Sequence, residues 1–464
     1  MDETKGAVPA GTSAMPAKPD AWVAEARPEF EACLRQLVEI PTVSSDPARK
    51  SEMRRGAEFA ADLLRHFGAE ARVVNTEGHP AVVGEFRAEG AARTITVYNH
   101  LDVQPATASE WTHPPFTCHA EDGRYFARGA TDDKGPALVA LFAARRARSC
   151  GVPLNIRFLW EMEEEIGSPN FEPLVRHHKD ELHTDSVLVS DTVWAAKGRP
   201  CVDYGLRGLL GFVLRLKTGT KDIHSGLAGG GARNPFAELV DLINHMYDPR
   251  TGKVRIPGFY DDVQKPTRAE MENFLASGFA VSKFKAAHGL KSLRSNDPAT
   301  LMKNLWTQPT FEIHGFAGGY SGPAIKTIIP PMAEVKLSMR LVPNQDPKRI
   351  LTLLRKFVHE TAPEIEVEPH GFLEPYLGPS TGPYAEAATE AIKYGFGRKP
   401  AFIREGGSIG AVVSMARVLK APVLLMGLSL PEHSYHGPDE HFDWGQASGG
   451  MKSFGRYFER VAEI

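Results

Sequence analysis

With 464 residues, of which 42% are hydrophobic and 24% charged, the chain has the composition of a globular protein of about two to three domains. Its net charge of -3 argues against binding to nucleic acid or to an anionic membrane, and no apolar run reaches the ~18 residues of a membrane-spanning helix. The four cysteines are scattered without a Cys-x-x-Cys pair, which indicates a reducing compartment, so we predict a cytoplasmic protein.

The chain begins as an alternation of helices and strands. Residues 1–20 are rich in alanine, proline and glycine and lack the apolar core of a signal peptide, so we expect a disordered tail there. Apolar residues recur at helical spacing over 22–38 and 54–67, and apolar runs predict strands at 71–74 and 81–86. This alternation is typical of α/β proteins.

The next predicted strand, 94–98, leads directly into two residues that can serve a metal site. Its β-branched and aromatic residues are typical of a buried strand. His100 and Asp102 follow, two positions apart and therefore on the same side of an extended chain. A carboxylate beside a metal-binding imidazole fixes the tautomer of the ring. Taken alone, His-x-Asp is more often a hydrogen-bonded pair in a turn.

Acidic residues also stand at the start of the following helix, which is predicted at 136–147. The run Arg128-Gly-Ala-Thr-Asp132-Asp133-Lys-Gly135 leads into this helix. Acidic residues at a helix start are typical of a capped N-terminus, where they stabilise the helix by roughly 0.5–1 kcal/mol. Capping explains one aspartate, but it leaves the second aspartate and the flanking arginine and glycines unexplained.

A strand predicted at 155–160 runs into Glu161-Met-Glu163-Glu164-Glu165. Four carboxylates within five residues repel one another unless they are solvated or neutralised. A solvated loop is the ordinary explanation of such a run. A dicationic site would instead use one carboxylate as a ligand and a neighbour with a raised pKa for proton transfer.

Two further predicted strands end in candidate ligands. The strand over 185–190 ends at Asp191, and the apolar run 421–430 is followed by Pro431-Glu-His433-Ser-Tyr-His436. Each site has an ordinary explanation of its own, but ligands at the carboxyl ends of neighbouring strands meet at one edge of a sheet. Carboxylates combined with two imidazoles suit Zn, Mn or Co better than Ca or Mg. The candidate positions are His100 with Asp102, Asp132, Glu164 with Glu165, Asp191 and His436.

After Asp191 the pattern changes to that of a second, smaller domain. This order of elements suggests a small split β-α-β, ferredoxin-like domain. Its elements are long alternating strands at 205–217 and 333–342, amphipathic helices at 235–247 and 347–359, and a last strand at 365–369.

The predicted fold class is therefore α/β with two structural domains. A mixed sheet flanked by helices forms the catalytic domain over residues 21–207 and 376–464. A smaller α+β domain is inserted over 208–375, and within it residues 250–310 form an irregular helical insertion.

Together these motifs resemble those of the M20 metallopeptidases, the superfamily of di-zinc aminoacylases and carboxypeptidases, and most of all its carnosinase and cytosolic non-specific dipeptidase branch. The resemblance runs from about Pro28 to the C-terminus, with one departure at Asp439, where the family often has asparagine. The motifs, in chain order, are His-Leu-Asp at 100–102, Arg-Gly-Ala-Thr-Asp-Asp-Lys-Gly at 128–135, Glu-Glu-Ile-Gly-Ser at 164–168, Ser-Asp at 190–191 and His-Gly-Pro-Asp-Glu at 436–440.

The resemblance implies a site for two divalent metal ions per subunit, either Zn or Mn, with Co as a further candidate. Asp132 would bridge the two ions. The remaining ligands would be His100 and Asp191 for one ion, and Glu165 and His436 for the other.

The resemblance also implies roles beside the ligands. Asp102 would orient His100, Glu164 would act as general base and acid, and the peptide bond after Asp132 would be cis. Three consecutive glutamates, 163–165, allow a shift of register at this point. The following Gly-Ser pair favours Glu164 as the base and Glu165 as the ligand.

By the same resemblance, the inserted domain would be a lid and dimerisation domain. His224 would reach across a homodimer to stabilise the oxyanion in the partner's site, and Thr327 would accompany it. Arg340 is a candidate to hold the substrate carboxylate with its planar guanidinium, and His370 would assist. Ser408 begins a helix predicted over about 408–419, whose backbone donors suit an anion.

The sequence therefore predicts metal-assisted hydrolysis of short peptides, mainly dipeptides. The alternative is an amidohydrolase for N-acyl amino acids, because an aminoacylase of the same superfamily would use the same ligands. A non-catalytic scaffold is disfavoured because no ligand or base is missing. An oxidoreductase is disfavoured because no Gly-x-Gly-x-x-Gly motif follows a strand.

Overall fold

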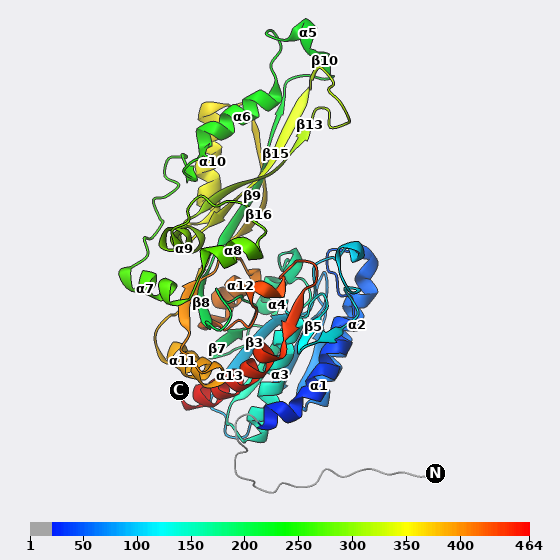
Figure 1. Ribbon diagram of the computed structural model, residues 1–464, viewed down its shortest axis with the longest axis vertical. Helices are drawn as coiled ribbons and strands as arrows, with labels where there is room; N and C mark the ends of the chain where they lie inside the picture. The colour runs from blue at the N-terminus through cyan, green and yellow to red at the C-terminus, as the bar shows by residue number, and fades with distance from the viewer. Residues whose placement is uncertain (1–20) are drawn as a thin grey trace.

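The computed structural model describes residues 21–464, so the tail predicted over 1–20 lies outside the described residues. The molecule is elongated, with a large sheet at one end and a smaller sheet at the other (Figure 1). None of the helices in the described part is long and apolar enough to cross a bilayer.

The large sheet is mixed and carries the predicted strands at its centre. Strand β3 runs parallel to both of its neighbours, β6 and β7, so the carboxyl ends of all three strands lie at one edge. The strands in spatial order are β1 (Glu70–Val74), β2 (Ala81–Phe86), β6 (Asn155–Glu161), β3 (Thr94–His100), β7 (Ser186–Val189), β19 (Val423–Leu425), β8 (Cys201–Leu206) and β17 (Tyr376–Leu377), while β18 (Ala401–Arg404) pairs with β8.

Helices cover both faces of this sheet, which explains why its central strands are apolar throughout. Val97 of β3 packs in one helix-covered core, and the next residue, Tyr98, packs in the core on the opposite face. One face carries α1 (Ala21–Val38), α2 (Lys50–His66), α3 (Lys134–Ser149), α11 (Pro383–Phe396) and α13 (Trp444–Glu463), and the other carries α4 (Phe171–His177) and α12 (Gly410–Leu419).

A small three-stranded sheet at the side of the large one was not predicted. It brings residues near 120 together with residues near 440, so the chain segments that adjoin this sheet carry the predicted ligands towards one another. Its strands are β4 (His119–Glu121), β5 (Arg124–Phe126) and β20 (His441–Asp443).

The smaller sheet has the predicted ferredoxin-like arrangement, with four antiparallel strands in the order β13, β15, β9, β16. Helices α6 and α10 pack on one of its faces. The bounds are β9 (Gly208–Lys217), α6 (Pro235–Met246), β13 (Thr310–Gly318), β15 (Met332–Leu341), α10 (Pro347–Thr361) and β16 (Glu366–Leu373).

The far tip of the smaller domain contains a short antiparallel pair of strands and a single-turn helix. The strands are β10 (Ile223–His224) and β14 (Ile328–Ile329), and the helix is α5 (Ser225–Ala228). Figure 1 shows β10 and α5 at the end of the molecule opposite the large sheet.

The helices of the insertion pack on the large sheet, whereas apolar residues within its first part, Val254 to Phe259, are buried in the core of the small domain. Phe274 and Trp306 form a buried cluster with Trp194 and Ile403 of the large domain. The insertion contains β11 (Tyr247–Asp248), β12 (Lys253–Val254), α7 (Arg268–Ala276), α8 (Val281–Ala287) and α9 (Pro298–Thr307). The domain boundaries at 207/208 and 375/376 stay a prediction, but part of the inserted sequence lies against the catalytic sheet.

Two predicted elements are shorter in the structure. The run 421–430 forms a strand only over Val423–Leu425, and beyond it Gly427 passes so close to Thr192 that an added Cβ would lie 2.1 Å from its carbonyl oxygen. The helix predicted from 408 begins at Gly410, and the Ser408 hydroxyl before it donates to the Arg207 carbonyl oxygen at 2.5 Å.

Candidate metal centre

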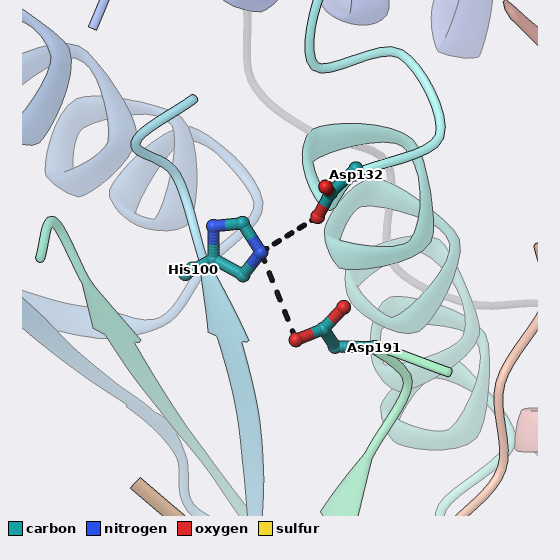
Figure 2. A group of neighbouring side chains, drawn as sticks. All are labelled: His100, Asp132 and Asp191. Atoms are coloured by element: carbon teal, nitrogen blue, oxygen red, sulfur yellow. Dashed lines mark hydrogen bonds and ion pairs between the residues drawn. The ribbon is translucent and has the colours of Figure 1, made fainter. Parts of the chain in front are cut away.

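The first group of candidate ligands gathers around His100, the last residue of β3. The ring is 1% exposed, and its Nε2 lies 2.9 Å from Asp132 Oδ1 and 3.7 Å from Asp191 Oδ2. Figure 2 shows both carboxylates facing this nitrogen, one from the start of α3 and one from the end of β7. The ends of two parallel strands and the start of a helix thus meet at the edge of the sheet where ligands are expected.

The second group shares Asp132 with the first. Asp132 Oδ2 lies 2.8 Å from His436 Nε2, and Glu165 Oε2 lies 3.3 Å from the same nitrogen. Gln104 donates from its amide to Glu165 Oε2 at 2.6 Å, which fixes the carboxylate. The peptide bond between Asp132 and Asp133 is cis, as the resemblance implied.

Asp102 connects the imidazole to the glutamate turn. Its backbone oxygen lies 3.0 Å from His100 Nδ1, so that nitrogen is protonated and Nε2 is left with the lone pair a metal needs. Its two carboxylate oxygens accept the backbone N–H groups of Glu164 and Glu165, each at 3.1 Å. A single residue therefore orients His100 through its backbone oxygen and the glutamate turn through its side chain.

The three consecutive glutamates have different surroundings. Glu163 Oε1 accepts from the backbone N–H of His79 at 2.7 Å, and Glu163 also pairs with Asn170, so it lies outside the two ligand groups. Glu165 belongs to the second group. Burial raises the pKa of Glu164 well above its ordinary value, and the neighbouring carboxylates of Asp191 and Glu165 raise it further. Glu164 is therefore a carboxyl that readily holds a proton.

The donor set suits two cations. Within residues 21–464, the ligand atoms of each group lie within 4.8 Å of one another. Burial raises the pKa of Asp191 to about 7, and the nearby Asp132 carboxylate adds to that increase. Asp132 Oδ2 has no well-aligned hydrogen-bond donor among the described residues, although it is buried. Carboxylates so close together need positive charge between them, and carboxylate–imidazole sets are typical of Zn or Mn.

The predicted substrate residues of the smaller domain fall into two places. Arg340 donates to the Ser408 hydroxyl at 2.9 Å, so these two residues join the small sheet to the large domain. Arg340 and His370 line the same cavity of about 580 Å³ on the open face of the small sheet. His224 and Thr327 instead lie together at the far tip, where Ser225 N–H donates to the Thr327 carbonyl oxygen at 3.0 Å.

Two further residues touch this region and were not predicted. The Tyr435 hydroxyl donates to Asp191 Oδ1. In the sequence, its position directly before His436 could have indicated that it lies near the ligands. Burial raises the pKa of Glu405 well above its ordinary value, and the carboxylates of Asp203 and Asp191 raise it further. Glu405 directly precedes the Gly-Gly-Ser turn that the sequence did single out.

Comparisons with known proteins agree with this geometry. The model of peptidase family M20/M25/M40 matches residues 96–460. The Cys-Gly metallodipeptidase dug1 of Schizosaccharomyces pombe is 30% identical over 461 residues, covering 94% of this chain and 96% of that protein. The Beta-Ala-His dipeptidase of Homo sapiens is 29% identical over 460 residues, covering 94% of this chain and 90% of that protein.

The fold is also found among solved structures. The M20 family metallo-carboxypeptidase of Sulfolobus solfataricus superimposes with a TM-score of 0.87 at 32% identity, covering 94% of this chain and 100% of that chain. The predicted fold class is thereby confirmed. The two ligand groups, the order of the motifs and the extent of these matches lead to one conclusion: the chain belongs to peptidase family M20/M25/M40.

Proposed function

We propose that this protein hydrolyses the peptide bond of dipeptides with two divalent metal ions held around Asp132. The observation that carries the proposal is the shared carboxylate, which offers one oxygen to each ligand group, with Glu164 next to the ligand Glu165. Both curated relatives described above are named as dipeptidases.

The ligand sets we propose are His100, Asp132 and Asp191 for one ion, and Asp132, Glu165 and His436 for the other. We propose Zn or Mn as the ions, with Co as a further candidate, because two imidazoles are combined with carboxylates. When bound, such ions supply the positive charge that activates a water molecule and polarises the scissile carbonyl.

Glu164 is the proposed general base and acid. Its burial favours the protonated carboxyl, so it can take a proton from the attacking water and keep it until the leaving amine needs it. Asp102 keeps Glu164 in place through the backbone N–H of that residue, at 3.1 Å, and orients His100 at the same time.

The two ends of a dipeptide would be bound by groups of opposite charge. Arg340, with Ser408 beside it and His370 in the same cavity, is the proposed partner of the C-terminal carboxylate. Glu405 is the proposed partner of the free ammonium group. It lies close enough to Asp191 for that carboxylate to raise its pKa. Recognition of both termini would favour dipeptides over blocked or longer substrates.

We propose that the protein acts as a homodimer. Leu227 and Ile325 at the lid tip are 88% and 89% exposed, although they are large apolar residues. His224, the last residue of β10, is also exposed, and Figure 1 shows β10 far from the large sheet. A partner's active site would cover these apolar side chains and place His224, with Thr327, near the oxyanion. The cytoplasmic location stays a prediction.

The test is a substrate panel with metal-stripped protein to which Mn or Zn is added back. Free dipeptides are compared with N-acetyl amino acids, N-blocked dipeptides and longer unblocked peptides. We expect cleavage of free dipeptides with a much higher kcat/KM than the others. A preference for N-acetyl amino acids would move the protein to the amidohydrolase alternative. A preference for longer peptides would contradict the dipeptidase proposal.

A further inference from the structure

His433 is a buried imidazole that the proposed mechanism does not use. It stands three residues before the candidate ligand His436, in the 3-10 turn η4 (Pro431–His433), and is 0% exposed. It belongs to neither ligand group of the described residues. Its ring makes contacts with Thr131, the residue immediately before Asp132.

The hydrogen bonds of the His433 ring fix its protonation. The backbone N–H of Leu430 donates to Nδ1 at 3.2 Å, so Nδ1 carries no proton. Thr131 Oγ1 lies 2.9 Å from the same nitrogen, and its hydroxyl is therefore the donor. Nε2 carries the proton and donates it to Asp443 Oδ2 at 3.2 Å. The ring is a neutral connector between Asp443 and Thr131.

The turn that contains Thr131 is held by the same C-terminal loop at further points. Ser429 Oγ lies 2.8 Å from Thr131 Oγ1 and 3.1 Å from the Thr131 carbonyl oxygen. Glu440 Oε1 accepts the backbone N–H groups of Thr131 and Asp132 at 3.0 and 3.1 Å. Thr131 is 1% exposed, so its hydroxyl cannot reach a substrate, and the Asp443–His433–Thr131 series is no nucleophilic triad.

We propose that His433, oriented by Asp443, is a positioning residue that places the Asp132 carboxylate between the two metal ions. The inference rests on the proposed function, because it requires that the ions bind there. Asp132 Oδ1 faces His100 at 2.9 Å and Oδ2 faces His436 at 2.8 Å, so a small rotation of the 131–132 backbone moves one oxygen away from each group. Groups behind metal ligands commonly control metal affinity in this way.

The experiment compares a variant that loses the hydrogen bonds of the His433 ring with a variant that keeps those made to Nδ1. His433→Leu keeps the bulk of the side chain but abolishes all three hydrogen bonds of the ring, whereas the oxygen of His433→Asn can still accept from Leu430 and Thr131. We expect His433→Leu to weaken binding of the more weakly held metal by about 10- to 100-fold and His433→Asn to recover much of the loss. At saturating metal, KM is expected to stay unchanged, because the ring does not touch substrate.

The matched control is His441→Leu. The His441 ring lies 5.2 Å from that of His433, but its Nδ1 contacts the Asp439 carbonyl oxygen and not the Thr131 turn. This variant is expected to bind both metals like the wild type. Asp443 is unsuitable as a target, because it also accepts the Gln446 N–H at the start of α13 at 2.8 Å.

Thr131→Val provides a second route if His433→Leu does not fold. It replaces the hydroxyl by a methyl group, and the double variant with His433→Asn should bind metal no better than Thr131→Val alone, because the asparagine can help only by accepting from the Thr131 hydroxyl. The readouts are the metal-binding isotherm and the rise in melting temperature that metal produces. Wild-type metal affinity in His433→Leu and Thr131→Val would overturn the inference. Failure of the wild type to bind two metals would contradict the proposed function instead.

Discussion

The carboxylate of Asp132 faces one imidazole with each oxygen, His100 at 2.9 Å and His436 at 2.8 Å. This symmetry explains why a buried aspartate is needed at the start of α3, where helix capping alone would accept a serine or threonine equally well. Asp102 has the opposite task, since both of its oxygens are occupied by backbone N–H groups at 3.1 Å. Asp132 is thus a proposed metal ligand, whereas Asp102 holds the glutamate turn in place.

Replacement of Glu164 tests the proposed proton transfer at a single carboxyl. Glu164→Gln should lower kcat by about 10²- to 10⁴-fold, because the amide cannot accept the proton of the attacking water. Metal content and melting temperature should remain near those of the wild type. Glu163→Gln is the control, because Glu163 bonds to His79 and Asn170 outside the ligand groups. A fully active Glu164→Gln enzyme would remove this residue from the mechanism.

Asp203 provides a pH-dependent stability effect. Burial raises its pKa from 3.8 to about 7, although the nearby Thr192 hydroxyl lowers it in part, and neither carboxylate oxygen has a well-aligned hydrogen bond among residues 21–464. The folded protein therefore binds more protons than the unfolded chain between about pH 4 and 7. Stability should fall as the pH rises through this range, by at most about 1.4 kcal/mol per pH unit from this group, and level off above pH 7.

Asp203→Asn should flatten that decline. The free energy of unfolding of the metal-stripped proteins is measured in urea at several pH values between 5 and 8. The variant is expected to become more stable relative to the wild type as the pH rises. Parallel curves for the two proteins would show that Asp203 does not titrate with a raised pKa in the folded state.

Among the elements, the strands that end in ligands could be predicted from the sequence because they are short, apolar and followed by charge. The strand predicted over 94–98 extends in the structure to His100, which lies in the first ligand group at the edge where the parallel strands end. Strand β13 was missed because its apolar alternation covers only Phe311 and Ile313 before the irregularity at Gly315 interrupts it. Glu405 and Tyr435 were missed because their importance depends on tertiary neighbours rather than on spacing.

The helical insertion illustrates the same limit at the scale of an element. Its sequence predicted irregular helices, but its contacts join it to the large sheet through Phe274 and through Glu270, which accepts from the Tyr204 hydroxyl at 2.5 Å and pairs with Arg404. Arg404 directly precedes Glu405. Hence a segment inserted in the lid sequence supports a strand end of the catalytic sheet, which no local pattern reveals.

Truncation of one aromatic side chain tests how firmly this insertion is attached. Phe274 is 0% exposed, so Phe274→Ala should lower the free energy of unfolding by about 3–5 kcal/mol through lost burial and a cavity. Limited proteolysis should then cut within residues 250–310 faster than in the wild type. Leu275→Ala is the matched control, because Leu275 directly follows Phe274 but its side chain is 55% exposed. Equal proteolysis of both variants would contradict the proposed attachment.

At the scale of the whole molecule, the elongated shape separates the lid tip from the metal centre of the same chain (Figure 1). If His224 acts in the partner's site, two inactive variants should complement each other. Co-expressed Glu164→Gln and His224→Ala chains should recover about a quarter of wild-type activity, since half of randomly formed dimers are mixed and each has one intact site. No recovery, with mixed dimers present, would place His224 outside the partner's active site.

The central claim is that catalysis needs two metal ions around Asp132, and a metal titration tests it most directly. Metal-stripped protein is titrated with Mn or Zn while bound metal and dipeptide hydrolysis are measured on the same samples. We predict two ions bound per subunit, no hydrolysis without metal, and full activity only after the second equivalent. Full activity with one equivalent, or activity that survives complete metal removal, would contradict the account.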